Sequence, residues 1–163
     1  MKILVVSDTH RHLQNLKIVL DRVGPIDRVI HLGDVEMDEE RIRKMVTCPV
    51  DIVAGNNDYL SKCPRELEKE FEGYHFFMVH GHQYNVAMGL GRLAAEAEGH
   101  QAQVALFGHT HRPKLERKGS LTLMNPGSLT YPRQPGRVPS YGIIEIDRFG
   151  EIHFTLNYLE DSR

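Results

Sequence analysis

The sequence is poor in the residues that mark several large classes of protein. It has no tryptophan, and its two cysteines, Cys48 and Cys63, are too few for a disulfide framework and do not form a CxxC pair. No apolar run reaches the roughly 18 residues that cross a bilayer, and the apolar N-terminal segment lacks the basic region and cleavage site of a signal peptide. We therefore expect a cytoplasmic protein with no membrane span.

Neither sign of charge dominates the chain. It has 20 lysines and arginines against 22 acidic residues, a formal net charge of -2, so no global basic field would recruit nucleic acid or an anionic membrane. Any polyanion would have to bind locally. Histidine, by contrast, is abundant: ten of the 163 residues are of the type that most often binds metals and carries protons near neutral pH.

Short apolar runs bounded by glycine or polar residues are typical of buried strands. The first part of the chain has five of them, at Lys2–Val6, Arg28–Leu32, Val50–Ala54, His75–Val79 and Gln103–Phe107. Between the first two runs, apolar residues recur at helical spacing until Gly24-Pro25, which is a helix stop signal. This pattern predicts a βαβ unit, and strands that alternate with helices favour an α/β layer architecture.

Three further helices are predicted, around Ile42–Val46, Pro64–Phe71 and Val86–Gly99. The middle one depends on a run of charges, Arg65–Glu72, which we interpret as a solvated helix face.

Beyond His111 the pattern changes to strands with short turns, at Lys114–Arg117, Ser120–Met124, Tyr141–Ile146 and Glu151–Leu156. A second sheet is therefore expected. The whole chain, 1–163, is predicted to be a single α/β domain: a two-sheet β-sandwich flanked by helices, with four layers in the order α-β-β-α.

Each of the five early runs ends in a small residue or turn with a metal-competent side chain. The segments are Ser7-Asp8-Thr9-His10, Gly33-Asp34, Gly55-Asn56-Asn57-Asp58, His80-Gly81-His82 and Gly108-His109-Thr110-His111. Because ligands bind beyond the carboxyl ends of strands in open α/β sheets, we expect these side chains to meet at one edge of one sheet.

Two carboxylates, one amide oxygen and four imidazoles form a ligand set without thiolate. Such a set suits Mn, Fe, Ni, Co or Zn, and it is too large for one tetrahedral ion. Two divalent transition-metal ions that share a carboxylate account for the number of ligands. Their positive charge would exceed that of the two carboxylates, so the substrate is expected to be an anion.

The ordered motifs resemble those of the calcineurin-like metallophosphoesterase superfamily. They are Asp8-X-His10, Gly33-Asp34, Gly55-Asn56, His80 and Gly108-His109-X-His111. The short chain, His80-Gly81-His82 and Asn125-Pro126-Gly127-Ser128 resemble the small prokaryotic phosphodiesterase branch, whose fold is a sandwich of two sheets flanked by helices. The resemblance extends from Lys2 to about Ser128.

The resemblance implies a ligand set for each metal. The first ion would be held by Asp8, His10, Asp34 and His111, and the second by Asp34, Asn56, His80 and His109, with Asp34 as the bridge. A hydroxide that bridges the two metals would attack phosphorus in line, while both ions polarise the phosphoryl oxygens.

One position departs from the broader superfamily. Many members have Gly-Asn-His-Asp or Gly-Asn-His-Glu, in which the histidine is thought to protonate the leaving group, but this chain has Asn57 there. An asparagine can only donate a hydrogen bond to the phosphoryl group. Catalysis would then depend on leaving groups that need little protonation, such as aryl esters or pyrophosphate linkages, unless His12 or His82 supplies the proton.

Other side chains are candidates for substrate contacts. The segment Asn125–Ser128 reads first as a turn, and the resemblance implies that Asn125 or Ser128 lies near a phosphate oxygen. Arg133 and Arg137 would either clamp an anionic substrate or remain solvated. The other histidines are expected to be structural or exposed: His31, inside a strand, as a hydrogen-bonded core residue, and His75, His100 and His153.

The sequence thus predicts a binuclear metal-dependent phosphoesterase, in particular a phosphodiesterase that hydrolyses small phosphate esters. One alternative is a non-catalytic protein-interaction scaffold on the same fold, as in a retromer subunit. The other is a nuclease, which would need a local basic groove that only Arg11, Arg112, Arg133 and Arg137 could begin to form. A homo-oligomer, dimer or tetramer, would fit the resemblance.

Overall fold

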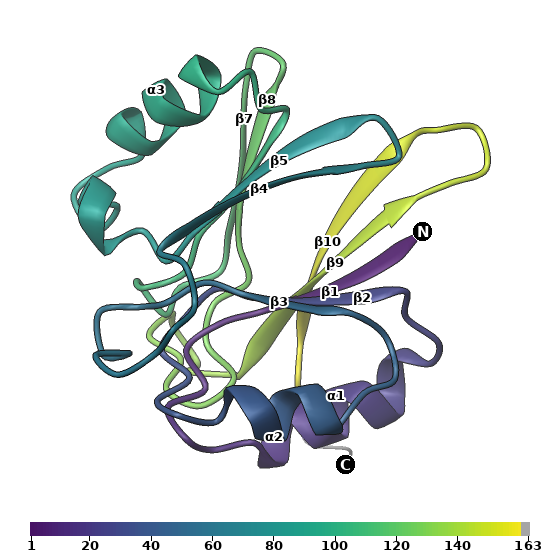
Figure 1. Ribbon diagram of the computed structural model, residues 1–163, viewed down its shortest axis with the longest axis vertical. Helices are drawn as coiled ribbons and strands as arrows, with labels where there is room; N and C mark the ends of the chain where they lie inside the picture. Colours follow the sequence, from purple (N-terminus) through teal and green to yellow (C-terminus); the bar gives the residue numbers. More distant parts are fainter. Residues whose placement is uncertain (161–163) are drawn as a thin grey trace.

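Ten strands form two five-stranded sheets in the computed structural model, which describes residues 1–160 (Figure 1). The first sheet has the order β10 (Ile152–Tyr158), β9 (Ser140–Ile146), β1 (Lys2–Val6), β2 (Arg28–His31) and β3 (Val50–Ile52). The second has the order β4 (Glu66–Phe71), β5 (Tyr74–Val79), β6 (Val104–Leu106), β8 (Leu121–Asn125) and β7 (Lys114–Lys118). Both sheets are mixed: β1–β2 and β2–β3 are parallel in the first sheet, β5–β6 and β6–β8 are parallel in the second, and the other neighbouring strands pair antiparallel.

The helices cover the outer faces of the two sheets. Helices α1 (Gln14–Val23) and α2 (Glu39–Lys44) pack on the first sheet, and the 3₁₀ helix η1 (His82–Tyr84) precedes α3 (Gly91–Gly99), which packs on the second (Figure 1). Three apolar clusters fill the spaces between α1/α2 and the first sheet, between the sheets, and between the second sheet and α3. The predicted α-β-β-α layer order is confirmed.

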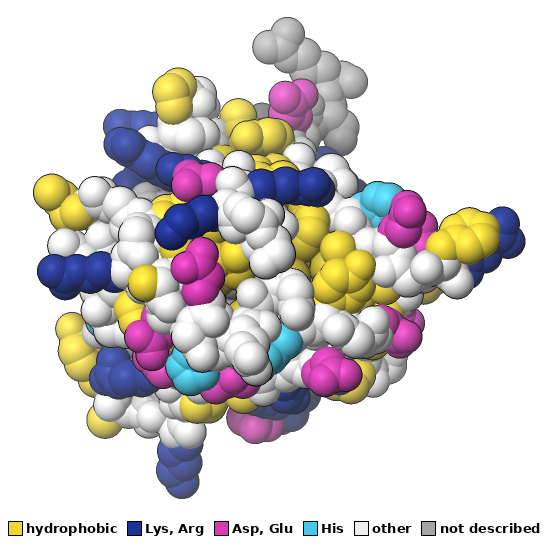
Figure 2. Space-filling model, turned by 90° about the horizontal axis from the view of Figure 1, so that it is seen from above, with side chains coloured by type: hydrophobic (Ala, Val, Ile, Leu, Met, Phe, Trp, Pro, Cys, Tyr) yellow, Lys and Arg dark blue, Asp and Glu magenta, His cyan; other side chains and the backbone are white. Residues whose placement is uncertain are grey.

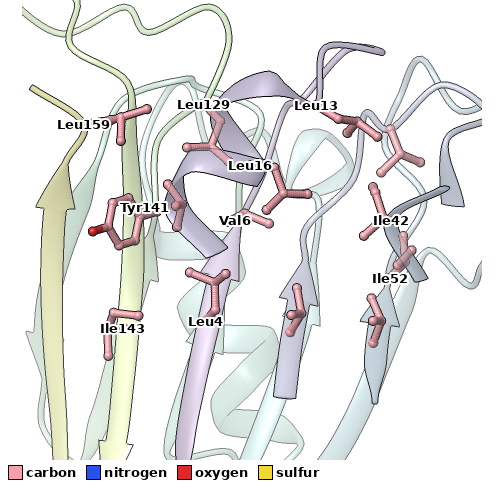
Figure 3. Packing of buried hydrophobic residues seen from close by; sticks show 14 residues of the cluster. Leu4, Val6, Leu13, Leu16, Ile42, Ile52, Leu129, Tyr141, Ile143 and Leu159 are labelled. Carbon is pink, nitrogen blue, oxygen red and sulfur yellow. The ribbon is translucent and has the colours of Figure 1, made fainter. Parts of the chain in front are cut away.

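Strand β1 is buried on both faces because its alternate residues belong to different cores. Leu4 and Val6 point toward α1, where Leu16 packs against the sheet (Figure 3). Ile3 and Val5 point into the space between the sheets. Two buried faces explain why the strand reads as a continuous apolar run and not as an alternation.

The predicted helix at Pro64–Phe71, with its solvated run Arg65–Glu72, is wrong. Residues Glu66–Phe71 form β4, in which exposed glutamates alternate with more buried residues and Phe71 is buried. The hairpin to β5 turns at Glu72 and Gly73, both with positive φ (47° and 85°), as a two-residue hairpin turn requires. The alternation of exposed and more buried residues with a period of two, followed by a two-residue turn, predicts a strand, but the many charges suggested a helix surface.

Two other expectations need correction. The helix predicted from Val86 begins only at Gly91, although Val86 is buried against the same core. The five strands that precede the polar motifs do not share one sheet: β1, β2 and β3 lie in the first and β5 and β6 in the second. The motifs therefore meet where the edges of two sheets come together.

An ion network joins the outer strands of the two sheets. Asp51 on β3 accepts hydrogen bonds from Arg28 Nη1 (2.6 Å) and from Lys69 Nζ (2.5 Å), which lies on β4. The Arg28 guanidinium also lies 4.8 Å from the centroid of the Phe71 ring. These contacts fix one side of the sandwich.

No helix among the described residues is long and apolar enough to cross a membrane. The face seen from above Figure 1 carries positive and negative side chains interspersed with hydrophobic ones, so no charge of one sign dominates it (Figure 2).

Candidate metal centre

The loops that follow five strands converge at the left of Figure 1. Asp8 and His10 follow β1, Asp34 follows β2 and Asn56 follows β3; from the second sheet, His80 follows β5, and His109 and His111 follow β6. All seven predicted ligand positions lie in these loops, and the contacts below bring them together.

The loops approach each other so closely that only glycine fits at some positions. A Cβ on Gly108 would lie 2.0 Å from Ser7 Oγ, and one on Gly55 would lie 2.1 Å from Asp34 Oδ1. The backbone of Asp8 and Asp34 is left-handed, with φ of 55° at both, a conformation that costs about 1–3 kcal/mol at a non-glycine residue. Strain and close packing therefore place the two carboxylates.

Both carboxylates are buried, Asp8 completely and Asp34 to 2% exposure. Asp8 Oδ2 accepts hydrogen bonds from Ser7 Oγ (2.6 Å) and from the backbone N–H of His109 (3.1 Å). Asp8 Oδ1 is buried and has no hydrogen-bond partner among residues 1–160. Burial alone would raise the pKa of Asp8, but His111, His80 and Ser7 together lower it to about 2. The group is therefore an anion at neutral pH.

Three histidines are oriented in the same way. The Nδ1 atom of each lies 2.7 Å from an acceptor: Glu36 Oε1 for His10, the Leu32 carbonyl for His80 and the Tyr131 carbonyl for His111. Because these acceptors have no hydrogen to give, Nδ1 is the donor, and in the neutral ring Nε2 carries a lone pair.

These Nε2 atoms face the carboxylates. His111 Nε2 lies 3.1 Å from Asp8 Oδ1, and His10 Nε2 lies 3.8 Å from both Asp8 Oδ1 and Asp34 Oδ2. His80 Nε2 lies 3.5 Å from Asp34 Oδ2 and 3.9 Å from Asp8 Oδ1. The Nε2 atoms of His10 and His111 are only 3.2 Å apart.

Asn56 and His109 extend the cluster. Asn56 Oδ1 lies 3.0 Å from His80 Nε2 and 2.9 Å from His109 Nδ1. Lone pairs of nitrogen and oxygen thus point at a common space with few hydrogens between them. Such an arrangement is stable with cations in that space, and the residues present fit divalent metals with nitrogen and oxygen ligands. Two triads are close enough to share an ion: within Asp8–His10–His111, and within Asp8–Asp34–His80, the three ligand atoms lie within 4.8 Å of one another.

The protonation of the imidazoles follows from their neighbours. For His111, burial would lower the pKa, but the nearby carboxylate of Asp8 raises it above its usual value, against the opposing charge of Arg133. Burial, followed by the charge of His80, lowers the pKa of His109.

The two candidate catalytic residues, Asn57 and His82, lie next to the cluster but have partners of their own. Asn57 Nδ2 donates to Asp34 Oδ2 (2.7 Å), and the Asn57 backbone N–H donates to Asp34 Oδ1 (2.9 Å). His82 Nε2 lies 3.1 Å from Arg65 Nη1 and accepts its hydrogen, so Nδ1 is the donor. That Nδ1 is buried without a partner among the described residues, and the His82 ring lies 5.5 Å from the His80 ring.

Asn125 and Ser128 lie inside the protein, beneath the ligand loops. Both are completely buried, and Asn125 Nδ2 donates to the Gly108 carbonyl (2.9 Å) and Thr110 Oγ1 (3.0 Å). Ser128 Oγ donates to the Asp8 carbonyl (2.8 Å) and accepts from the backbone N–H of Tyr131 (2.9 Å). Their polar groups are used within the protein, where they position the loops; contact of either residue with a phosphate oxygen stays a prediction.

The remaining candidates lie at the rim. His12 is exposed, and its Nε2 lies 3.1 Å from the hydroxyl of Tyr131, a half-exposed ring that also lies 5.4 Å from the ring of His10. Arg133 and Arg137 are exposed on the following loop, and the Arg133 backbone N–H donates to the His111 carbonyl (2.9 Å).

Four histidines lie apart from the cluster, as expected. His31 is completely buried, accepts a hydrogen bond from the Gly33 N–H and lies 3.0 Å from Thr9 Oγ1. His75 and His100 both contact the carboxylate of Glu68. His153 is exposed beside Asp147.

Sequence reasoning missed three supporting residues. Glu36 orients His10, Arg65 contacts His82, and the buried Asp58 accepts hydrogen bonds from the backbone N–H groups of Asp34 and Gly55 (2.7 Å each). Only Asp58 carried a local signal, as the last residue of the Gly55-Asn56-Asn57-Asp58 turn. The other two make contacts that no sequence spacing indicates.

Residues 1–148 match the calcineurin-like phosphoesterase superfamily domain. The chain belongs to this superfamily. Among curated relatives, a probable metallophosphoesterase of Mycoplasma pneumoniae is 33% identical over 144 residues, which cover 86% of each chain. A phosphodiesterase of Methanocaldococcus jannaschii is 27% identical over 170 residues, which cover 91% of this chain and 95% of that one. The similarity to these proteins therefore extends over most of the chain and is not confined to the metal-ligand motifs.

Solved structures share the fold of this calcineurin-like phosphoesterase domain. A conserved, uncharacterized protein from Streptococcus pneumoniae, described as a predicted phosphoesterase, superposes with a TM-score of 0.79 at 28% identity and covers 97% of both chains. Vps29 of Entamoeba histolytica, complexed with zinc, has a TM-score of 0.78 at 23% identity and covers 97% of this chain and 99% of that one. The second likeness shows the fold alone.

Proposed function

We propose that the chain is a phosphodiesterase that uses two divalent transition-metal ions to hydrolyse small phosphate esters. The observation that carries the proposal is the orientation of the imidazoles. Hydrogen bonds from Nδ1 commit the Nε2 lone pairs of His10, His80 and His111 to the space where two buried carboxylates also converge. Cations in that space would remove the repulsion among these acceptors.

The contacts support one assignment of ligands. Asp8, His10, Asp34 and His111 would hold the first ion, and Asp34, Asn56, His80 and His109 the second. Asp34 Oδ2 is within 3.8 Å of nitrogen ligands from both sets, His10 and His80, as a bridging carboxylate requires. Mn, Ni, Fe, Co and Zn all suit this set of nitrogen and oxygen donors.

When bound, two such ions lower the pKa of water and stabilise the charge that develops on the phosphoryl oxygens. The chain's own residues would orient the ester. Asn57 Nδ2 is a hydrogen-bond donor beside the cluster that would contact a phosphoryl oxygen or a leaving-group oxygen, and the buried, unpartnered His82 Nδ1 is a second donor nearby.

Neither donor is suited to protonate a poor leaving group. The amide of Asn57 does not give up a proton near neutral pH, and His82 accepts the hydrogen of Arg65 at Nε2, which favours the neutral ring. The site is therefore matched to diesters with leaving groups of low pKa, such as aryl esters and pyrophosphate linkages. Replacing Asn57 by histidine should increase the hydrolysis of alkyl esters more than that of aryl esters, and equal effects on both would contradict this match.

Metal analysis and turnover test the proposal together. The purified protein should bind two equivalents of Mn or Ni and hydrolyse bis-p-nitrophenyl phosphate, and Asp34→Asn should lose both properties. Asp21→Asn, which changes an exposed carboxylate on α1, is the matched control and should keep them. A protein that binds no divalent metal and turns over no ester would instead favour the scaffold alternative.

A further inference from the structure

Two cavities lie beside the metal centre, on the side of the second sheet. One, of about 640 Å³, is lined by His109 and Thr110 of the ligand loop and by an apolar wall that includes Met88 and Leu90. The other, of about 680 Å³, is lined by Tyr131 and the loop that follows it. Arg112 and Arg133 line both cavities, which therefore adjoin each other at these two side chains.

Three guanidinium groups in these walls are unneutralised. Arg112, Arg133 and Arg137 are exposed, and none of them forms an ion pair with an acidic residue within the described part of the chain, residues 1–160. No aspartate or glutamate lines either cavity. Lys114, which also lines the first cavity, differs because it pairs with Glu116 at 3.0 Å.

The arginine-bearing loop is attached directly to a metal-site histidine. His111 Nδ1 donates to the Tyr131 carbonyl (2.7 Å), and the Arg133 N–H donates back to the His111 carbonyl (2.9 Å). Arg112 follows His111 in the sequence. Two of the three guanidinium groups therefore extend from backbone that is fixed relative to the reaction centre, which limits the distance at which a bound anion can lie from it.

A third cavity, next to the loops that follow β2 and β3, differs in its charges. It has a volume of about 280 Å³ and is lined by Arg11 together with Glu36, Asp58 and the exposed side chains of Tyr59 and Leu60. Its single arginine is accompanied by two carboxylates. A second anionic group on a substrate would thus be attracted to the first two cavities and not to this one.

We infer that Arg112, Arg133 and Arg137 form a subsite for a second phosphate group of the substrate. The inference rests on the proposed function and deepens it: the natural substrate class is a small phosphodiester or pyrophosphate ester that carries a phosphate besides the scissile one. Guanidinium groups bind phosphate through paired, charge-assisted hydrogen bonds. The organic part of the substrate lies against the apolar wall at Met88 and Leu90.

A matched pair of substrates isolates the second phosphate. Thymidine 5′-(p-nitrophenyl phosphate) and its 3′-phosphorylated analogue have the same leaving group and the same scissile diester. The wild-type protein, loaded with Mn, should hydrolyse the 3′-phosphorylated analogue with a kcat/KM about 10- to 100-fold higher, mainly through a lower KM. In the double variant Arg112→Gln/Arg133→Gln this ratio should fall to about one, as hydrogen bonds to charged groups are lost.

Arg117→Gln is the matched control because it removes an exposed arginine from β7, outside both cavities, and should keep the wild-type ratio. Circular dichroism and thermal unfolding check that each variant folds. Equal kcat/KM for the two diesters in the wild-type protein would overturn the subsite, and so would a preference that survives in the double variant.

Binding separates this inference from the proposed function. With chelator present, calorimetry should show that thymidine 3′,5′-bisphosphate binds the wild-type protein more tightly than thymidine 5′-phosphate, and that the double variant loses the difference. If neither diester is hydrolysed with any metal, the proposed function fails, and the binding result alone decides the subsite. A further gain of more than about tenfold for a p-nitrophenyl-capped oligothymidylate would overturn the small-molecule assignment in favour of nucleic acid.

Discussion

The first sheet supplies every carboxylate of the candidate metal centre, whereas the second sheet supplies only imidazoles. Asp8 and Asp34 follow β1 and β2, while His80, His109 and His111 follow β5 and β6. One half of the sandwich therefore brings negative charge, and the other brings neutral donors that compete with protons. Neither half has a complete site, so a bound metal would stabilise the contact between the two sheets.

The two halves also hold their histidines differently. His10, from the first sheet, is oriented by the side chain of Glu36, which is partly exposed. His80 and His111, from the second, are oriented by backbone carbonyls, and the carbonyl that holds His80 is that of Leu32, just after β2 of the first sheet. Of these three hydrogen bonds, only the one that orients His10 can be removed by substituting a side chain.

The largest expected effect is on activity, and it should be greater when a carboxylate of the first sheet is replaced than when an imidazole of the second sheet is replaced. Asp8→Asn should lower kcat/KM for bis-p-nitrophenyl phosphate by at least about a thousandfold, because a buried charge that would hold the metal is lost. His109→Gln should cost less, about 10- to 100-fold, because this half-buried ligand can be replaced in part by water. Equal losses in the two variants would remove the distinction between the sheets.

Metal removal is expected to weaken the contact between the sheets. Because the ligands converge only in the folded chain, metal at about 100 times its Kd should add about 2.7 kcal/mol to the free energy of unfolding. Thermal unfolding with Mn and with chelator measures the difference, and Asp34→Asn should be insensitive to both. A wild-type protein whose Tm does not change with Mn would contradict the expectation.

Replacing Glu36 tests the hydrogen bond that orients the His10 ring. Glu36→Gln should reduce metal affinity about tenfold, because the carboxylate that fixes the His10 ring and increases its basicity is replaced by a neutral amide. Calorimetric titration with Mn measures the affinity. Glu40→Gln, at an exposed position of α2, is the control, and a similar loss there would point to a general effect of charge.

The last prediction concerns a first-sheet histidine outside the cluster. Burial lowers the pKa of His31 from its usual 6.5 to about 3, so below pH 6.5 the unfolded chain takes up a proton that the folded chain excludes. His31 should therefore reduce stability by up to about 1.4 kcal/mol per pH unit as the pH falls from 6 to 4. Urea unfolding in chelator should show a shallower pH dependence in His31→Gln, and identical slopes would exclude the effect.

The fold was predictable where periodicity and local turns agree. The buried strands and α1 follow from apolar runs and a helix stop signal, and the four layers follow from their order. The strand β4 was missed because its exposed glutamates resemble a helix surface, although Glu72-Gly73 favours a hairpin. The division of the ligand strands between two sheets was missed because a motif at a strand end does not indicate which strand pairs with it.

The candidate site was predictable to the extent that its ligands follow strands directly. Asp8, Asp34 and His80 do, and their convergence is a property of strand ends. The supporting contacts are different: Glu36 reaches His10, and Arg65 reaches His82, across loops whose geometry no local pattern determines. The burial of Asn125 and Ser128 was equally hidden, because a turn motif does not reveal whether its polar groups face inward.

The close approach of glycine backbones has a consequence for reading related sequences. A Cβ at Gly33 would lie 2.8 Å from His80 Nδ1, and one at Gly108 would lie 2.0 Å from Ser7 Oγ and 2.9 Å from Asp8 Oδ2. A relative could keep every ligand and still lose the site through a single alanine at Gly108. These glycines are therefore as informative as the ligands when active enzymes are to be told apart from relatives that retain only the fold.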